Sequence, residues 1–409
     1  MRSVFSRSSG GRGLRGTLTE ESRQVVLVVA STYPVPGVAG VPRFVETLSS
    51  ALSSHLDVHV VALARGVESR GSVSSESGIQ VTRVGRRGGV PGSGVLSSLR
   101  VRSLLPELWL ITRWLFKVAL LARRTKPTVI HVHWAFPVPP LLRLLRALRI
   151  VDNKFQYFVT LHGADVLLLD GKLRRLMKFG LRGAEGITTV NEQYRRVVGE
   201  AVSDRAVEVV VIPMPVDARF YGVSRRSGFV DGSFLFVGRL IPKKGVEELV
   251  RAVSYSTPLS ERGLRLIGSG ELFELRRLSS TSVDFLGPAQ ADGVLQAMCE
   301  ARALICPFVN PEGLPVTVLE ACATGVPVIS SRVSGVQALE QFGFVVWPIS
   351  DPVCPESIAD AVARFELDLA EEPGRVAMIV QQNRERALRF TPTHVAGEFL
   401  SLFDVGASN

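Results

Sequence analysis

Two glutamates with seven residues between them, Glu312 and Glu320, flank a segment whose composition predicts the start of a helix. Pro315 suits the first helical position because it has no N–H to leave unpaired and its φ already matches a helix. We therefore expect the helix to begin just after Glu312 and to carry Glu320 in its second turn. The N–H groups of Gly313 and Leu314 would then lie at the positive end of the helix dipole, where anions bind.

Such a layout could hold a polyhydroxylated molecule by its hydroxyls at two places, with a phosphate between them. Gly313 would let the ligand approach the backbone closely. Taken alone, two such carboxylates are more often a solvated helix face and a first-turn charge that complements the helix dipole. The rest of the chain decides between these interpretations.

A second group of candidate residues follows the apolar run 234–237. Arg239 and Lys244 lie in a loop bounded by Gly238 and Gly245. A planar guanidinium and a point-charge ammonium at the end of a strand could together neutralise a diphosphate. Two further runs, 264–267 and 283–287, end in glycine turns, and these place Gly268 and Leu286 near the same sheet edge.

His162 ends the apolar run 156–161 and precedes Gly163. The carboxyl end of a strand is where active sites of α/β proteins form. A lone histidine is also common as an ordinary core or surface group. The loop from Ser31 to Gly40, after the first apolar run, is placed to line the same kind of site.

The order of these runs predicts the fold. Continuous apolar segments without alternation are typical of strands buried on both faces of a parallel sheet, and here they alternate with helical patterns. We expect an α/β protein with two doubly wound Rossmann-like domains that face each other across a cleft. A chain of 409 residues is long enough for two cores. The expected divisions are a disordered basic tail (1–23), an acceptor domain (24–215), a donor domain (216–390) and a C-terminal helix packed back on the first domain (391–409).

Composition limits the setting of the protein. The four cysteines at 299, 306, 322 and 354 show no CxxC spacing, so we expect small core residues without a disulfide frame or a zinc site. The Ser-, Gly- and Arg-rich start contains no apolar core of a secretory signal. A cytoplasmic protein is therefore expected.

The stretch 98–149 contains ten Lys and Arg against one acidic residue, Glu107, within a chain of net charge +10. Its leucine and tryptophan residues would stripe one side of a helix, with Arg113 and Lys117 on another face. No segment is apolar over the length that a membrane span requires. An amphipathic basic helix can lie on an anionic bilayer, at the inner face of a membrane. A core helix whose basic residues face water is the alternative.

Taken together and in order, the motifs resemble those of glycosyltransferase family 4. The resemblance covers about residues 24–404 and is strongest in the second half. It depends on the following segments: 236–239 with Lys244 and Gly245, 267–270, 283–287, 311–315 with Glu320, and 327–329. The family consists of retaining enzymes of the GT-B fold that transfer sugar, usually a hexose, from nucleotide diphosphate donors.

The resemblance implies roles for single residues. Glu312 would hold the hydroxyls of the donor sugar and Glu320 the ribose, while Arg239 and Lys244 neutralise the diphosphate. His162 would lie beside the reacting sugar carbon. The remaining donor-binding positions would be Gly40, Gly268, Leu286, Gly313 and Leu314. Two positions depart from the family pattern: Ala39 stands where a first glycine is frequent, and Ala338 where a glutamate is frequent.

The expected reaction needs neither a cofactor nor a metal. No Asp-x-Asp pair is evident, and preorganised cations with helix N–H groups can stabilise the charge that develops on a departing diphosphate. Asp165 is the one carboxylate close to His162 in sequence that could serve as a nucleophile. The resemblance favours a front-face route in which the leaving phosphate receives the proton of the acceptor.

The expected partners are a nucleotide sugar, a glycan or lipid-linked acceptor and an anionic membrane surface. Two rival functions fit parts of the sequence. A non-catalytic basic protein that binds nucleic acid or anionic lipid would fit a pI near 9.9, but nucleic-acid motifs are missing, so no nucleic acid partner is expected. An NAD-dependent enzyme would place G-x-G-x-x-G after the first strand, and residues 31–40 do not contain it.

Overall fold

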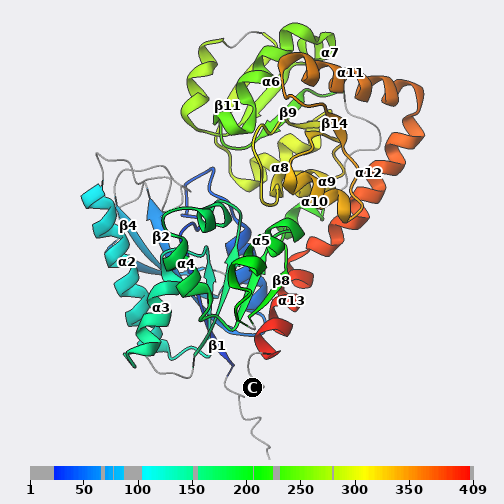
Figure 1. The fold of residues 1–409 in the computed structure, drawn as a ribbon. Coiled ribbons are helices and arrows are strands. Elements are labelled where there is room, and N and C mark those ends of the chain that lie inside the picture. The colour runs from blue at the N-terminus through cyan, green and yellow to red at the C-terminus, as the bar shows by residue number, and fades with distance from the viewer. Residues whose placement is uncertain are drawn as a thin grey trace, which may run out of the picture.

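The computed structural model describes residues 23–65, 70–76, 78–86, 104–150, 155–205, 207–223, 231–278 and 281–405. The expected tail, apart from Arg23, lies outside these residues, and so does the part of the basic stretch from 98 to 103. Figure 1 shows two lobes, the lower built mainly by the first half of the chain and the upper mainly by the second.

The first lobe is built on a sheet of eight strands in the order β3-β4-β2-β1-β5-β6-β7-β8. Neighbouring strands are parallel except β3 and β4, which are antiparallel. The strands are β1 (Val25–Ala30), β2 (Asp57–Arg65), β3 (Arg70–Glu76), β4 (Ile79–Arg86), β5 (Val129–His133), β6 (Gln156–Leu161), β7 (Gly186–Thr189) and β8 (Glu208–Val211). The edge strand β3 was not predicted, because its serine-rich sequence has no apolar run.

Helices connect these strands, as right-handed crossover connections require. They are α1 (Phe44–Leu52), α2 (Leu104–Thr125), α3 (Val138–Ala147), α4 (Arg174–Leu181) and α5 (Glu192–Val202), with the short 3₁₀ helix η3 (Val166–Asp170). The 3₁₀ helix η4 (Ala218–Phe220) follows β8 and packs on the second lobe, where Phe220 is buried. The core lies between sheet and helices; Val26, Val28, Val58 and Val129, for example, are almost fully buried.

The second lobe has a six-stranded sheet in the order β11-β10-β9-β12-β13-β14, and its strands pair in parallel. The strands are β9 (Phe234–Val237), β10 (Leu264–Ile267), β11 (Val283–Gly287), β12 (Leu304–Cys306), β13 (Val328–Ser331) and β14 (Trp347–Ile349). The helices around it are α6 (Val246–Ala252), α7 (Thr257–Arg262), α8 (Ala291–Glu300), α9 (Val316–Thr324), α10 (Ser334–Gln341) and α11 (Pro355–Glu371), with 3₁₀ helices η5 (Pro242–Lys244), η6 (Val253–Tyr255) and η7 (Glu271–Leu278).

The predicted fold class, two doubly wound Rossmann-like domains, is confirmed. Both sheets have the strand order of a doubly wound sheet, in which the chain starts at an inner strand and continues outward to each side. The continuous apolar strands explain this arrangement, since each is covered by helices on both faces.

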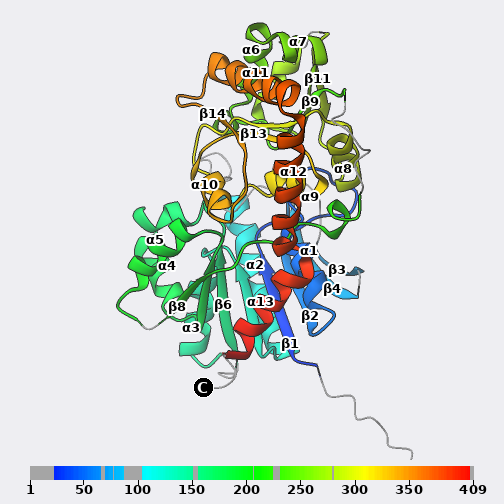
Figure 2. The same ribbon diagram turned by 90° about the vertical axis from the view of Figure 1, so that its right-hand side faces the viewer.

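Two helices carry the chain back from the second lobe to the first. α12 (Pro373–Ala387), the 3₁₀ helix η8 (Leu388–Phe390) and α13 (Pro392–Val405) follow one another along one side of the molecule, as Figure 2 shows. α12 packs on α9, whereas Val395, Phe399 and Phe403 of α13 are buried in the core of the first lobe. The last helix therefore belongs by packing to the lobe that the chain left near residue 212.

The helix α2 differs from the expected single stripe. Leu110, Trp114 and Val118 are buried against the sheet, as in a core helix. On the opposite side Leu105 is 81% exposed, Trp109 65% and Phe116 66%. The helix thus has two apolar faces, because its leucine and aromatic residues are too numerous for one stripe.

Packing of α13 predicts that Phe399→Ala destabilises the first lobe. Truncating a fully buried phenylalanine typically lowers the free energy of unfolding by about 3–5 kcal/mol, and Phe399 is fully buried beside His131 and Phe403. Urea unfolding followed by circular dichroism measures the change. The matched control is Phe116→Ala on the exposed face of α2, which we expect to stay within about 0.5 kcal/mol of the wild type. Equal losses in both variants would contradict the assignment of α13 to this core.

Candidate active site

The helix that carries Glu320 begins later than its sequence suggested. α9 starts at Val316, and Pro315 is its N-cap with ψ 89°, so the expectation of a helix starting just after Glu312 is wrong. Val318 and Leu319 donate to the Pro315 carbonyl, so the first helical N–H groups are those of Val316 and Thr317. Glu320 still lies in the second turn, as predicted.

A contact between the lobes explains the late start. A Cβ atom at Gly313 would overlap the carbonyl oxygen of His162, so only glycine fits this position. Asn191, the N-cap of α5, donates its Nδ2 to the carbonyl of Gly313 at 2.7 Å and accepts the N–H of Tyr194 at 2.8 Å. Residues 312–314 are thereby held against the first lobe and cannot continue the helix toward the N-terminus.

Glu312 is held between two lysines. Its Oε2 lies 3.0 Å from Nζ of Lys244, and its Oε1 lies 3.4 Å from Nζ of Lys243. The side chains of Glu312 and Lys244 are each only 14% exposed, and the Lys244 ammonium is 4.5 Å from the ring centroid of Phe308. Burial lowers the pKa of Lys244, and the charge of Glu312 opposes that shift. The result is a cation and a carboxylate within reach of the same ligand.

His162 follows β6 and is half-buried where the first lobe contacts Gly313 of the second. Burial, together with His131, lowers its pKa to about 3, so the ring is neutral at neutral pH. Its ring centroid lies 4.7 Å from that of Trp134 and 5.0 Å from that of Phe44. Among the described residues no group of three His, Cys, Asp or Glu side chains is arranged to hold a metal ion.

Asp165 supports the loop that carries His162. Its Oδ1 accepts the backbone N–H groups of His162 at 3.0 Å and Gly163 at 2.9 Å, and its Oδ2 accepts that of Ala135 at 3.1 Å. Burial raises the pKa of this carboxyl, and the three N–H donors oppose the shift. Both oxygens accept backbone N–H groups, so the side chain holds the loop in its conformation.

Glu320 lies apart from Glu312, in a different electrostatic environment. Burial and the nearby charge of Asp217 raise its pKa to about 8. Asp217 in turn accepts from Nε of Arg219 at 3.0 Å, and Arg219 reaches Asp292 at 2.6 Å.

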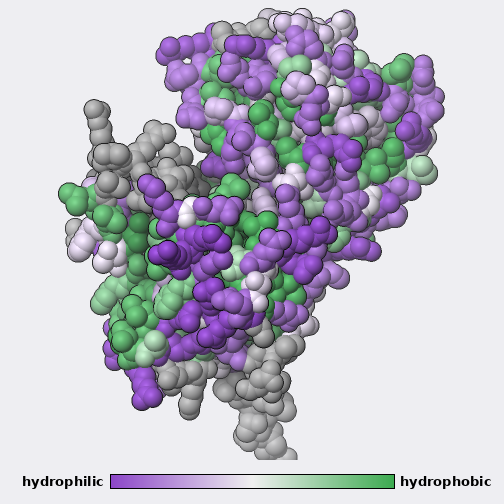
Figure 3. All heavy atoms as spheres, in the orientation of Figure 1, coloured by the Kyte–Doolittle hydropathy of each residue, from purple (hydrophilic) through white to green (hydrophobic). Residues whose placement is uncertain are grey.

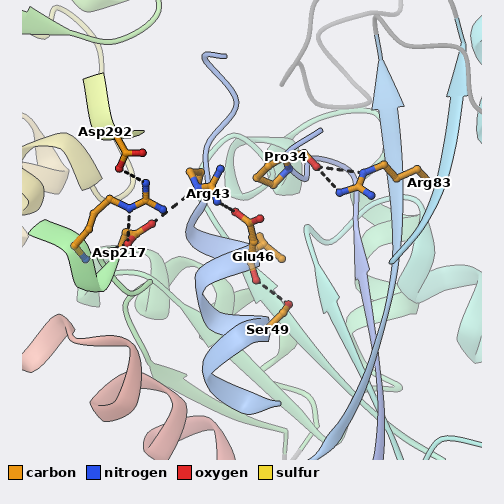
Figure 4. Close-up of polar contacts among 9 residues, drawn as sticks. Pro34, Arg43, Glu46, Ser49, Arg83, Asp217 and Asp292 are labelled. Atoms are coloured by element: carbon orange, nitrogen blue, oxygen red, sulfur yellow. Dashed lines mark hydrogen bonds and ion pairs between the residues drawn. The ribbon is translucent and has the colours of Figure 1, made fainter. Parts of the chain in front are cut away.

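The same network extends into the first lobe (Figure 4). Arg43, just before α1, lies 3.9 Å from Asp217 and 2.6 Å from Glu46. Arg83 donates from Nη2 to the carbonyl of Pro34 at 2.8 Å, which holds the loop after β1. These contacts place the loop of residues 31–43 next to the residues that connect the lobes.

The other predicted site residues are spread around the same edge. Gly40 has φ 77° and approaches Ser269 and Pro288, which belong to the second lobe. Gly268, with φ 151°, passes so close to the carbonyl of Gly238 that a side chain would overlap it. Leu314 is half-buried between the two lobes.

Two predicted residues are less enclosed. Leu286 is 42% exposed at the end of β11, and Arg239 is exposed without an ion pair among the described residues. The structure therefore joins Lys244, Glu312, Gly313 and His162 into one cluster. It leaves Arg239 and Leu286 at the rim.

Sequence reasoning missed two residues of this region. Asn191 was passed over, although an asparagine directly after a short strand and three residues before Tyr194 is a typical N-cap signal. Asp217 was placed only in a connecting segment; its influence on Glu320 depends on the tertiary structure and has no local signal.

Two family models match the chain. The model described as Glycosyltransferase Family 4 matches residues 38–220, and the one described as Glycosyl transferases group 1 matches residues 231–368. The two matches cover most of both lobes in chain order, which is the arrangement of the GT-B class. The chain belongs to glycosyltransferase family 4, and the resemblance seen in its motifs is confirmed.

Comparisons with individual proteins agree with this class. The N-acetyl-alpha-D-glucosaminyl L-malate synthase of Bacillus anthracis is 25% identical over 56% of this chain and 62% of that protein. The GDP-mannose-dependent alpha-(1-6)-phosphatidylinositol monomannoside mannosyltransferase of Mycolicibacterium smegmatis is 26% identical over 89% of this chain and 94% of that protein. The chain spans about three fifths of the length of the first curated relatives that it matches.

Solved structures share the fold. The sucrose-phosphate synthase of Thermosynechococcus elongatus superposes with a TM-score of 0.71 at 18% identity, covering 95% of this chain and 100% of that one. At this identity the likeness concerns the fold alone.

The raised pKa of Glu320 predicts a pH-dependent stability. Between its ordinary value of 4.5 and about 8, folded Glu320 keeps a proton that the unfolded chain has lost. A rise in pH through this window therefore lowers the free energy of unfolding, by up to about 1.4 kcal/mol per pH unit. Glu320→Gln should remove this component, so the variant gains stability relative to the wild type from pH 5 to pH 8. Urea unfolding across that range measures it, with Glu261→Gln in exposed α7 as the control. Parallel pH profiles for wild type and Glu320→Gln would refute the prediction.

Proposed function

We propose that this protein is a retaining glycosyltransferase, of the hexosyltransferase type, that moves a sugar from a nucleotide diphosphate donor to a glycan or lipid-linked acceptor. The observation that carries the proposal is the cluster in which Lys244 contacts Glu312 while Gly313 lies against His162. A poorly exposed cation and its carboxylate partner thus lie in the second lobe next to Gly313, whose backbone contacts the backbone of His162 in the first. The membership in glycosyltransferase family 4 supports the same reaction.

Each residue has a proposed role in donor binding. Lys244 and Arg239 neutralise the diphosphate together with the N–H groups at the start of α9. Glu312 accepts hydroxyls of the sugar, Glu320 accepts those of the ribose, and His162 lies beside the anomeric carbon. Gly40, Gly268, Leu286 and Leu314 shape the walls around the nucleotide and phosphates.

The chemistry follows from the charge that develops. The bond between the anomeric carbon and the phosphate oxygen breaks, and its electron pair goes to the diphosphate, where fixed cations stabilise it without reorganising. The acceptor oxygen bonds to the same face of the carbon and gives its proton to the departing phosphate. The engagement of both Asp165 oxygens with backbone N–H groups supports this front-face route, because that carboxylate is not free to attack.

The proposed substrate classes are taken from the names of the similar proteins. The Mycolicibacterium protein is GDP-mannose-dependent and acts on a phosphatidylinositol monomannoside, whereas the Bacillus protein is named for L-malate. A lipid-linked acceptor is favoured here by the surface of the first lobe described below.

The donor assignment is tested by Lys244→Ala. Loss of a poorly exposed charge contact should weaken binding of nucleoside diphosphate by on the order of 2–4 kcal/mol, while circular dichroism stays unchanged. Calorimetric titration with UDP, GDP and ADP, and release of free nucleotide from radiolabelled UDP-, GDP- and ADP-sugars, are the measurements. Lys172→Ala, an exposed lysine of the first lobe, is the charge-matched control. If the wild type releases no nucleotide from any of these donors, the proposed function is wrong; unchanged affinity in Lys244→Ala would remove the lysine from the site.

We also propose that the first lobe docks on an anionic lipid surface, which would put the protein at the inner face of a membrane. No helix in the described part of the chain is long and apolar enough to cross a bilayer. α2 contacts α3, and α3 contacts α4. Exposed apolar residues occur along all three helices and their connections: Leu105, Leu108, Trp109, Phe116, Leu144, Leu148, Ile150, Leu167, Leu176 and Phe179.

Basic residues surround these side chains. Arg123 and Arg124 end α2, and Lys172, Arg174 and Arg175 lie at the start of α4; all five are exposed. Figure 3 shows apolar surface gathered over α2 and α3 on one side of the lower lobe. Each basic residue near an anionic surface contributes about 1 kcal/mol, and inserted tryptophan and phenylalanine side chains add to it. Positive charge around an apolar patch fits a bilayer that contains acidic lipids.

The docking surface is tested by co-sedimentation with liposomes of graded anionic content. We expect the wild type to pellet with highly anionic vesicles at low salt, and a variant with Arg113, Lys117, Arg123 and Arg124 changed to Gln to pellet several-fold less. The matched control changes four exposed arginines of the second lobe to Gln: Arg251, Arg276, Arg277 and Arg375. The two quadruple variants then have the same net charge. Wild type that remains in the supernatant, or two quadruple variants that lose binding equally, would exclude a specific surface and favour a soluble acceptor.

A further inference from the structure

Three histidines, His131, His133 and His162, lie in a row, in consecutive ring contact, and the last of them belongs to the candidate site. His131 and His133 are two positions apart on β5, so their side chains project from the same face of the sheet. Their ring centroids are 4.3 Å apart, and the ring of His133 stacks on that of His162 at 5.3 Å and 20°. Nδ1 of His133 lies 3.1 Å from Nε2 of His162, so one proton is shared between the two side chains.

Which ring nitrogen carries that proton follows from the buried ring nitrogens that have no hydrogen-bond partner. Burial keeps the pKa of His131 and His133 well below the ordinary value, so each ring carries a single proton at neutral pH. Nε2 of His133 and Nδ1 of His131 are buried and have no hydrogen-bond partner within the described part of the chain. A buried N–H without an acceptor is rarer in proteins than a buried lone pair without a donor.

The same rule gives a consistent assignment for the whole row. His131 carries its proton on Nε2 and donates it to Oγ1 of Thr160 at 2.7 Å, and Thr160 donates to Thr188 at 2.6 Å. His133 carries its proton on Nδ1 and donates it to Nε2 of His162. His162 must then carry its own proton on Nδ1, because its Nε2 is an acceptor.

We propose that His133 is a positioning residue that fixes His162 as the Nδ1–H tautomer, so that this ring offers an N–H to an oxygen of the donor sugar. The inference rests on the proposed function for its ligand but on the geometry of the free protein for its tautomer. Nδ1 of His162 has no partner among the described residues, and the ring is half-buried, so the N–H is available to a ligand. The reacting sugar would meet a neutral hydrogen-bond donor of fixed orientation.

The C-terminal helix holds the row in place. Phe399 lies 4.8 Å from the ring of His131 and Phe403 lies 5.5 Å from it. His131 in turn packs against His133, and it does not hydrogen-bond to His162. Removing the imidazole of His131 therefore removes its packing and its hydrogen bond to Thr160 but keeps the donor to His162, which makes His131 a matched control.

The first measurement is the tautomer itself. In protein labelled with ¹⁵N-histidine, the two ring nitrogens of His162 distinguish Nδ1–H from Nε2–H in a long-range ¹H–¹⁵N spectrum. The chain has six histidines, so assignment by substitution is practical. We expect Nδ1–H in the ligand-free wild type, loss of that state in His133→Phe, and its return in His133→Asn, whose amide N–H occupies the place of Nδ1. His131→Phe should keep the wild-type tautomer.

The second measurement is turnover with the nucleotide sugar that the donor panel identifies. His133→Phe should lower kcat by on the order of 10- to 100-fold with a KM for donor within about threefold, because a misplaced catalytic group costs up to about 100-fold. His133→Asn should recover most of kcat.

The outcomes separate this inference from the proposed function. A wild-type His162 in the Nε2–H form, or the same tautomer in wild type and His133→Phe, overturns the positioning role whatever the activity. A shift of tautomer in a protein that releases no nucleotide from any sugar donor supports the positioning role and rejects the proposed function. If His133→Phe does not fold, a His133→Asn variant that loses the Nδ1–H state overturns the role.

Discussion

The contact between Gly313 and the backbone of His162 is the constraint on which the rest of the site depends. It is closer than any side chain at position 313 allows, and Asn191 locks it with a hydrogen bond to the Gly313 carbonyl. On the other side, Asp165 fixes the loop of His162 through backbone N–H groups. Two loops, each held by hydrogen bonds and each from a different lobe, therefore meet at one point. The start of α9, the position of Glu312 and the environment of His162 all follow from this meeting.

Electrostatics completes the site from the second lobe. Lys244 and Glu312 are both poorly exposed, and each is the partner that makes burial of the other tolerable. In the proposed reaction a diphosphate takes the place of Glu312 beside Lys244, and sugar hydroxyls take the place of Lys244 beside Glu312. Lys244 and Glu312 each exchange one partner for another when the donor binds, so neither charge is left buried without a partner. Burial, and after it the charge of Asp217, disfavours ionisation of Glu320, and no ion pair with a cation within the described part of the chain offsets them, so its pKa moves upward.

The path of the chain ties the lobes together physically. α12 packs on α9 of the second lobe, and α13 buries Phe399 and Phe403 in the first, against His131. The carrier of Glu320 and the row of histidines are thereby attached to the same continuous pair of helices. A change in the angle between the lobes must be absorbed near η8 or in the connection before β9, since both ends of the pair are anchored by buried side chains.

The sequence by itself determined the fold class, the strands with continuous apolar runs and the types of residue that gather at the candidate site. β9 and β10 begin and end at the predicted residues because their apolar runs end at glycine positions. The serine-rich β3 was missed since an edge strand needs no apolar run, and the start of α9 was misplaced since the contact at Gly313 overrides the local preference of Pro315. Only the tertiary structure decided that Lys244 contacts Glu312, that Asp165 fastens a loop, and that His133 reaches His162. Those relations join segments between about 30 and 70 residues apart, and no local periodicity encodes the distance between side chains that meet only when sheets and lobes are packed.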